Sequence, residues 1–214
     1  MRESEANPIE TGPCLDCGHE QAGIPFCHSC GILRELPPRV DYFEALEMPR
    51  RFALEAETLQ EAFHQANRRL HPDRFAGHSD EEKQCSLSWS SLANTAYRAL
   101  KDPDARARYL LNLLGHTTNE AEKKKVPAEL AEEYFEMQEA LAEGDAEPLQ
   151  ALAERLKAIE ERTGEVLNAL RGECDVALAE NADPQSPVFG RLAAKLREAS
   201  YLRTMRTDLE RRLG

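Results

Sequence analysis

A proline-centred tripeptide, His71-Pro72-Asp73, divides two amphipathic stretches and constrains the fold more than any other feature of the chain. Apolar residues recur every three or four positions on both sides of it, which is the spacing of one helix face. The two sets are Leu59, Phe63, Ala66 and Leu70 before the tripeptide and Trp89, Leu92, Ala96 and Leu100 after it. Pro72 cannot continue the first helix, because it lacks the donor N–H and restricts the residue before it. The sequence therefore predicts two antiparallel helices joined by a polar loop that exposes the tripeptide.

Composition narrows the class of protein. The 214 residues carry a net charge of −12, which argues against nucleic acid or another polyanion as the main partner. No apolar run approaches the ~20 residues needed to span a bilayer, so we expect no membrane partner. Residues 1–12 include three glutamates and no apolar core, so we expect a disordered tail rather than a signal or transit peptide. These features predict an all-α protein of the cytoplasm.

Four cysteines within residues 13–36 form two matched pairs. Cys14-x-x-Cys17 and Cys27-x-x-Cys30 are each followed by a glycine, which permits the tight turn of a zinc knuckle. Two knuckles supply four thiolates and predict one closed tetrahedral Zn²⁺ site with a structural role, because the intervening stretch is too short and polar to form a core. A pair of disulfides is disfavoured in a reducing compartment, and redox chemistry usually needs a thioredoxin-like frame. Iron in the same four-sulfur site stays an alternative.

The residues around the tripeptide resemble the J domain, the module that docks on DnaK-class heat-shock ATPases. The second helix ends in a series of residues typical of that module: Asn94, Ala96, Tyr97, Leu100, Asp102, Pro103, Arg106 and Tyr109. Residues 41–46 resemble its short first helix, and the resemblance covers residues 41–115. It implies that His71, Pro72 and Asp73 contact the ATPase. A cationic patch around the loop could meet an acidic chaperone surface, and its members are Arg68, Arg69, Arg74 and His64.

Residues 128–214 show three further helical patterns, over 128–143, over 147–181 and from Pro187 onward. Three amphipathic helices with short turns predict an antiparallel bundle. Near-heptad spacing places Val166 in the core stripe of the second helix, and the stripe of the third begins at Val188. The linker Leu36-Pro37-Pro38 is expected to separate the cysteine module from the helices, so that loss of one cysteine unfolds the module alone.

A J domain followed by such a bundle resembles the HscB family of iron–sulfur cluster co-chaperones. The specific residues are Tyr42, Phe43 and Leu46, the turn from Pro49 to Leu54, Arg74 and Phe75 after the tripeptide, and Arg108 to Leu111. The family implies that the J domain stimulates ATP hydrolysis by a DnaK- or HscA-class chaperone. It also implies that the bundle holds the scaffold protein on which the cluster is built.

The scaffold contact would lie on the first bundle helix, at Ala131, Phe135, Glu136, Gln138 and Glu139. Phe135 follows the core residue Tyr134 by about 100° around the helix, so we expect its ring to be exposed. This face departs from the family pattern. Ala131 stands where a large aliphatic residue is common, Glu132 follows it, and Glu198 stands where the third helix often has an aromatic residue.

Two other functional classes fit the sequence less well. A zinc-ribbon regulator of transcription or translation would need a basic face, and residues 14–30 contain no lysine or arginine. An enzyme would need a phosphate loop, a nucleophile elbow or an open metal site, and none is found. A J-domain co-chaperone for a different client stays an alternative, since these motifs specify neither the client, the chaperone paralogue nor the oligomeric state.

Overall fold

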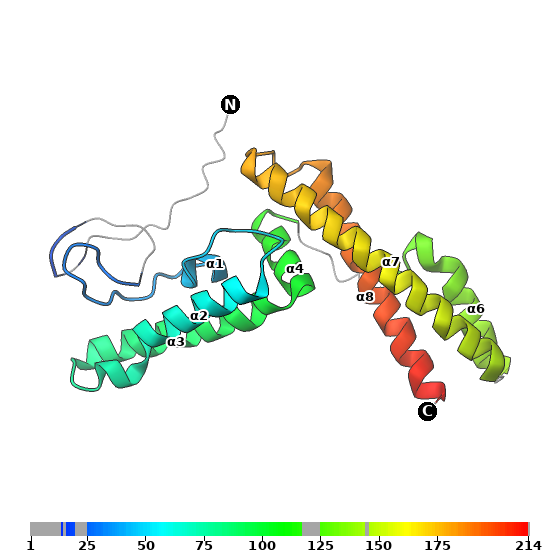
Figure 1. Ribbon diagram of the computed structural model, residues 1–214, viewed down its shortest axis with the longest axis horizontal. Helices are drawn as coiled ribbons and strands as arrows, with labels where there is room; N and C mark the ends of the chain where they lie inside the picture. Colours follow the sequence, from blue (N-terminus) through cyan, green and yellow to red (C-terminus); the bar gives the residue numbers. More distant parts are fainter. Residues whose placement is uncertain (1–13, 15, 20–24, 117–124, 144–145, 214) are drawn as a thin grey trace. The chain divides into compact units, whose positions relative to one another are not determined.

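The computed structural model describes residues 14, 16–19, 25–116, 125–143 and 146–213. Within these residues every regular element is a helix, apart from an isolated antiparallel bridge between Phe26 and Leu33, so the all-α prediction is confirmed. The chain forms two compact units, shown in Figure 1. The first contains the described residues up to Arg50 together with Leu54–Arg106. The second contains Arg51–Ala53 and the described residues from Ala107 onward.

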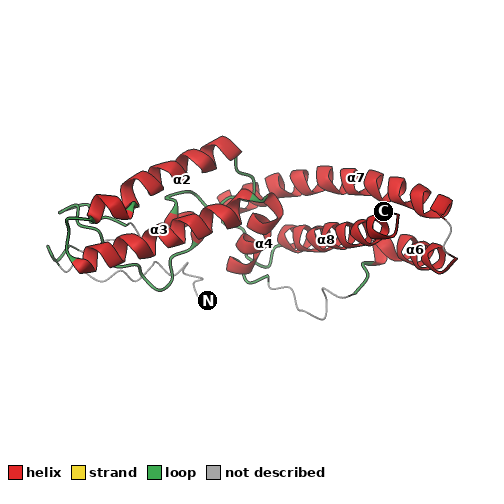
Figure 2. Ribbon diagram, turned by 90° about the horizontal axis from the view of Figure 1, so that it is seen from below, coloured by secondary structure: helices red, strands yellow, loops and turns green. Residues whose placement is uncertain are grey.

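The first unit is built on a helical hairpin. Helices α2 (Ala56–Leu70) and α3 (Asp80–Lys101) lie side by side and antiparallel, with the 3₁₀ turn η1 (Pro72–Phe75) at the tip (Figures 1 and 2). The facing stripes form its core, where these side chains are at most 2% exposed: Leu59, Leu70, Trp89, Ala96 and Leu100. The helical hairpin predicted from the apolar spacing is therefore present, with the His-Pro-Asp tripeptide at its connection.

Side-chain caps fix where the helices of this unit begin. The Asp41 carboxylate accepts hydrogen bonds from the backbone N–H groups of Phe43 and Glu44, which starts the short helix α1 (Tyr42–Ala45). Arg50 donates to the same carboxylate at 2.6 Å and so holds the loop after α1. Ser79 and Glu82 form a reciprocal capping box at the start of α3.

The cysteine-bearing segment makes contacts with this hairpin. The indole N–H of Trp89 donates to the carbonyl oxygen of Arg34 at 2.8 Å, and the Arg69 guanidinium lies over the ring of Phe26, 4.9 Å from its centroid. Leu33, between these contacts in sequence, is only 6% exposed. The expectation that the proline linker separates the module from the helices is therefore wrong. The segment that contains the Phe26–Leu33 bridge contacts both helices of the hairpin. Arg69 of α2 covers the Phe26 ring, and Trp89 of α3 donates to the Arg34 carbonyl.

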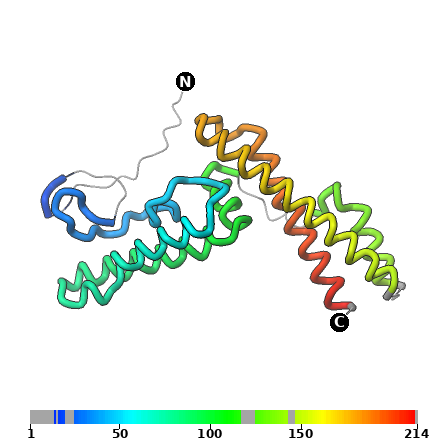
Figure 3. The backbone as a smooth tube through the Cα atoms, in the orientation of Figure 1, coloured from blue at the N-terminus to red at the C-terminus, as the bar shows by residue number. Residues whose placement is uncertain are grey.

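The second unit contains a three-helix bundle. A short turn η2 (Ala128–Leu130) leads into α6 (Ala131–Glu143), followed by α7 (Ala146–Ala179) and α8 (Pro187–Leu213). Helix α7 packs against both α8 and α6. The backbone trace in Figure 3 runs through α6, α7 and α8 in turn. The predicted helix bounds hold to within two residues, except that residues 128–130 form the turn η2 and α6 begins only at Ala131. Helix α4 (Pro103–Leu113) precedes the bundle, and the division between the two units falls within it, after Arg106.

The bundle core departs from the predicted stripes at two places. Val166 is 43% exposed, and Leu167 is buried in its place. A straight helix drifts by about 20° per heptad relative to a strict seven-residue repeat, so the core positions move on by one residue along α7. Val188 is half-buried, whereas its neighbour Phe189 is fully buried at the start of α8.

A three-residue strap, Arg51–Ala53, belongs to the second unit although α1 and α2 flank it in sequence. Phe52 is fully buried, and its ring stacks on Phe189 with centroids 6.0 Å apart. The Asp175 carboxylate on α7 accepts hydrogen bonds from the backbone N–H groups of Phe52 at 2.7 Å and Ala53 at 3.0 Å. One side chain thus satisfies two consecutive amides of the strap.

Candidate functional site

The tripeptide loop presents an exposed carboxylate from a rigid backbone. Pro72 occupies the first turn of η1, where its fixed φ fits a helix start. Nδ1 of His71 accepts a hydrogen bond from the backbone N–H of Asp73 at 3.3 Å, which ties the imidazole to the turn. The Asp73 side chain is 91% exposed and the His71 side chain 49%. Phe75, at the end of the turn, is buried and fixes it to the hairpin.

The predicted cationic patch contains residues in two different situations. Arg68 and Arg74 are exposed, and Arg74 donates to the carbonyl oxygen of Arg68 at 3.4 Å. Arg69 is engaged within the unit, because it pairs with Glu47 at 2.6 Å in addition to covering Phe26. His64 lies exposed one turn back along α2, within 3.3 Å of the Gln60 amide.

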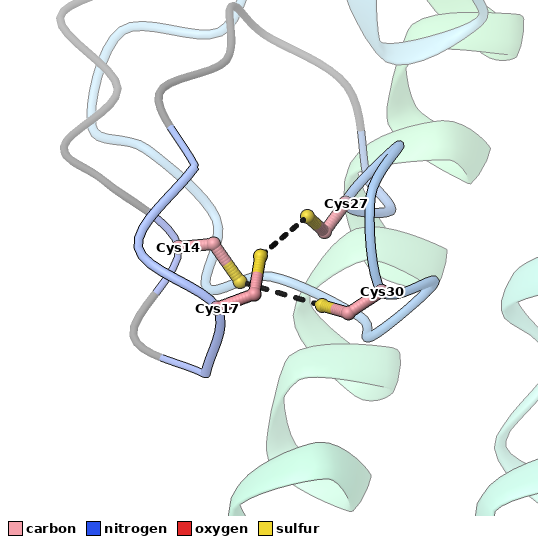
Figure 4. Close-up of side chains that lie close together, drawn as sticks. All are labelled: Cys14, Cys17, Cys27 and Cys30. Atoms are coloured by element: carbon pink, nitrogen blue, oxygen red, sulfur yellow. Dashed lines mark hydrogen bonds between the residues drawn. The ribbon is translucent and has the colours of Figure 1, made fainter.

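The four cysteine sulfurs converge on one point, as Figure 4 shows. Sγ of Cys14 lies 3.6 Å from Sγ of Cys30, and Sγ of Cys17 lies 3.6 Å from Sγ of Cys27. All four sulfurs lie within 4.8 Å of one another. A tetrahedron with metal–sulfur bonds of about 2.3 Å has edges of about 3.8 Å, whereas a disulfide requires about 2.05 Å. The four thiols are therefore free and spaced to hold one metal ion, as the sequence predicts.

The backbone of each cysteine pair makes the same turn. Gly18 N–H donates to the Cys14 carbonyl at 2.7 Å, and Gly31 N–H donates to the Cys27 carbonyl at 2.8 Å. Both glycines have positive φ, of 71° and 74°, which other residues adopt only with strain. The backbone N–H of Cys30 lowers the pKa of the Cys27 thiol to about 6, and the backbone N–H of Cys17 lowers the pKa of Cys14. These turns favour the thiolate form at Cys14 and Cys27, whereas burial and the neighbouring thiols raise the pKa of Cys17 and raise the pKa of Cys30 to about 12.

The α6 face predicted for scaffold binding exposes an aromatic ring. Phe135 is 71% exposed, which agrees with the predicted helix register. Gln138 and Glu139 are also exposed, and Ala131 is half-buried. Glu136 pairs with Arg155 of α7 at 2.7 Å, so its carboxylate already has a partner within the bundle. Glu132, beside Ala131, is exposed.

Two residues of α8 have positions that the sequence analysis did not predict. Glu198 is only 7% exposed and lies between α7 and α8, where it accepts hydrogen bonds from Thr163 at 3.2 Å and Lys195 at 2.5 Å. It therefore takes no part in an exposed face. Tyr201, which the sequence analysis did not single out, lies edge-on to Tyr134 with ring centroids 6.0 Å apart. Its position beside α6 depends on helix pairing and has no local sequence signal.

Among the described residues, no helix is both long enough and apolar enough to cross a membrane. No protein-family model matches the chain. Curated relatives that are named as HscB co-chaperones do match it. The HscB homolog of Bordetella avium is 32% identical over 170 residues, which is 79% of this chain and 95% of the relative. The homolog of Chromobacterium violaceum is 37% identical over 140 residues, 64% of this chain and 76% of the relative.

Further comparisons agree. The mouse iron–sulfur cluster co-chaperone HscB is 36% identical over 138 residues, 63% of this chain and 59% of the mouse protein. The crystal structure of the human co-chaperone HscB matches with a TM-score of 0.67 and 26% identity, over 92% of this chain and 96% of the human chain. HscB from Vibrio cholerae matches with a TM-score of 0.53 and 27% identity, over 80% and 96% of the two chains. On the extent of these matches and the geometry described above, the chain belongs to the HscB family of co-chaperones.

Proposed function

We propose that this protein stimulates ATP hydrolysis by a DnaK- or HscA-class chaperone and brings that chaperone an iron–sulfur cluster scaffold protein. The observation that carries the first half is the exposed Asp73 carboxylate on a fixed turn. A carboxylate so placed can accept charge-assisted hydrogen bonds from an arginine of the ATPase. His71 and Pro72 fix its direction, and Arg68 and Arg74 offer exposed cationic surface on the same end of the hairpin.

The scaffold contact is assigned to the α6 face. Phe135 supplies an exposed apolar ring, and burying such a ring at an interface commonly contributes about 2 kcal/mol or more to binding. Glu139 is exposed beside it and can steer a basic partner, whereas Glu136 is partly neutralised by Arg155. Ala131 and Glu132 leave the face smaller and more acidic than the family pattern, and this favours a different client as the second candidate.

Zn²⁺ is the metal we assign to Cys14, Cys17, Cys27 and Cys30. Four thiolates at tetrahedral spacing saturate the ion and leave no position for a substrate, so its role is structural. The ion would hold the two turns together, and the described part of the module contains only a small apolar contribution, chiefly Leu33.

The test is a steady-state ATPase assay with the purified chaperone and the full-length protein. Asp73→Asn should abolish stimulation, because a neutral amide cannot accept a charge-assisted hydrogen bond as the carboxylate anion does. Asp80→Asn is a matched control, since Asp80 is 94% exposed at the start of α3 and lies outside the tripeptide. Equal stimulation by the wild type and Asp73→Asn would refute the assignment. Capture of the scaffold protein by the wild type, and of no other client, would separate the first candidate from the second.

A further inference from the structure

The last carbonyl group of α2 has an unusual pair of partners. Leu70 ends the helix, and the backbone N–H that would continue the helical pattern, that of Arg74, bonds to the carbonyl oxygen of His71 instead. The Leu70 oxygen accepts hydrogen bonds from the hydroxyl groups of Ser86 and Ser90, each at 2.7 Å. Both serines belong to α3, one turn apart, so they reach across the hairpin to the same atom.

Because the acceptor and one donor are buried, these hydrogen bonds hold the backbone firmly in position. Leu70 is 1% exposed and Ser86 is fully buried, so water cannot replace the hydroxyl of Ser86 easily. A carbonyl oxygen has two lone pairs, and here both are used. Serine is a weaker helix former than alanine, because its hydroxyl competes for backbone groups. Two serines on the inner face of α3 are therefore explained by the acceptor that they share.

The shared acceptor belongs to the peptide group that leads into the tripeptide. The Leu70 carbonyl and the His71 nitrogen lie in one planar peptide unit, so fixing the oxygen fixes that plane. The direction in which His71, Pro72 and Asp73 leave α2 follows from the plane. On the other side of η1, Phe75 is buried. The loop is thus held at both ends, while the Asp73 side chain between them is 91% exposed.

We propose that Ser86 and Ser90 are positioning residues that set the direction of the His71-Pro72-Asp73 loop for chaperone stimulation. This inference rests on the proposed function. The serines lie on α3 and their hydroxyls bond to the Leu70 carbonyl, so they act through the Leu70–His71 peptide. Misplacement of a working group by about 1 Å can lower a rate by about a hundredfold. Loss of both hydroxyls should therefore lower maximal stimulation by about tenfold or more.

Single variants should have small effects, because the remaining hydroxyl still satisfies the carbonyl. The assay compares the wild type with Ser86→Ala, Ser90→Ala and the double variant. Ser90→Thr keeps a hydroxyl and should stimulate like the wild type. Ser91→Ala is the matched control, because Ser91 is exposed on the same helix. Since Arg68 lies on α2 and outside the displaced loop, maximal stimulation should fall more than the apparent affinity for the chaperone.

A second measurement is independent of the chaperone. In amide NMR spectra, the signals of His71 and Asp73 should move in the double variant and stay in place in Ser91→Ala. If the double variant does not fold, Ser86→Ala/Ser90→Cys is compared with Ser86→Ala, because a thiol has nearly the shape of the hydroxyl and is only a weak donor. Wild-type stimulation by the double variant, or unmoved loop signals, would overturn the inference. An inactive wild type with moved loop signals in the double variant would instead refute the proposed function and leave the positioning of the loop established.

Discussion

Removal of the metal should weaken the helical hairpin as well as the cysteine module. The perturbation we suggest is Cys27→Ser, because Cys27 directly follows Phe26, on whose ring Arg69 lies. Without the fourth thiolate the segment loses its folding energy, and its contacts with α2 and α3 are lost with it. This outcome differs from the expectation drawn from the proline linker.

The expected magnitude follows from three contacts. The hydrogen bond from Trp89 to the Arg34 carbonyl contributes about 1 kcal/mol. Burial of Leu33 contributes about 1.5–3 kcal/mol. The exposed Arg69–Phe26 contact adds about 0.5 kcal/mol. A loss of about 3 kcal/mol in a unit of this size lowers the melting temperature by roughly 12 °C or more.

The chain carries its own reporter for this experiment. Trp89 is the single tryptophan of the sequence, is fully buried and donates to the docked segment. Its emission should shift to longer wavelength in Cys27→Ser, and a thermal melt followed by this emission should show the lower midpoint. Chelation of the metal from the wild type should give the same two changes. Cys85→Ser is the control, because Cys85 lies outside the cluster. If the emission and the midpoint of Cys27→Ser equal those of the wild type, the coupling argument is wrong.

Three further outcomes are expected. Phe135→Ala should leave the melting temperature nearly unchanged and weaken scaffold binding by about tenfold or more in calorimetry, because the ring is exposed; a large loss of stability would contradict its assigned position. Asp175→Ala should destabilise the second unit by about 2–4 kcal/mol in urea unfolding, since two strap amides lose a charged acceptor, whereas Glu173→Ala, which removes an exposed ion pair, should change it by less than about 1 kcal/mol. Elemental analysis should find about one zinc per chain and no iron, the content that a closed four-thiolate site requires.

Local features of the sequence were sufficient for much of this structure. The break at Pro72 depends on the chemistry of one residue, and the exposure of Phe135 depends on one helical register. The clustering of the four cysteines depends on two short turns with the same spacing.

Features that depend on distant contacts were not predictable in the same way. Asp175 and Phe52 are 123 residues apart, and no local pattern pairs them. The contact between Trp89 and Arg34 depends on which surface the module finds, and the linker composition alone suggested none. Leu167 is buried where Val166 was predicted to be, because the core positions drift along a 34-residue helix. A short window of sequence does not reveal this drift. Glu198 stands where the family often has an aromatic residue, and only the structure shows that Thr163 and Lys195 are its partners in the interior.

The strap also determines how the protein can be cut into pieces. A fragment limited to residues 41–115 would retain Phe52 but lose both Phe189 and Asp175. The ring, fully buried in the intact chain, would enter water at a loss of about 1.5–3 kcal/mol, and two amides would need new acceptors. Newly exposed aromatic surface of this kind promotes self-association. Measurements of chaperone binding on an excised hairpin would therefore also report the self-association that truncation causes. Phe52→Ser within the fragment removes the exposed ring and would separate the two effects.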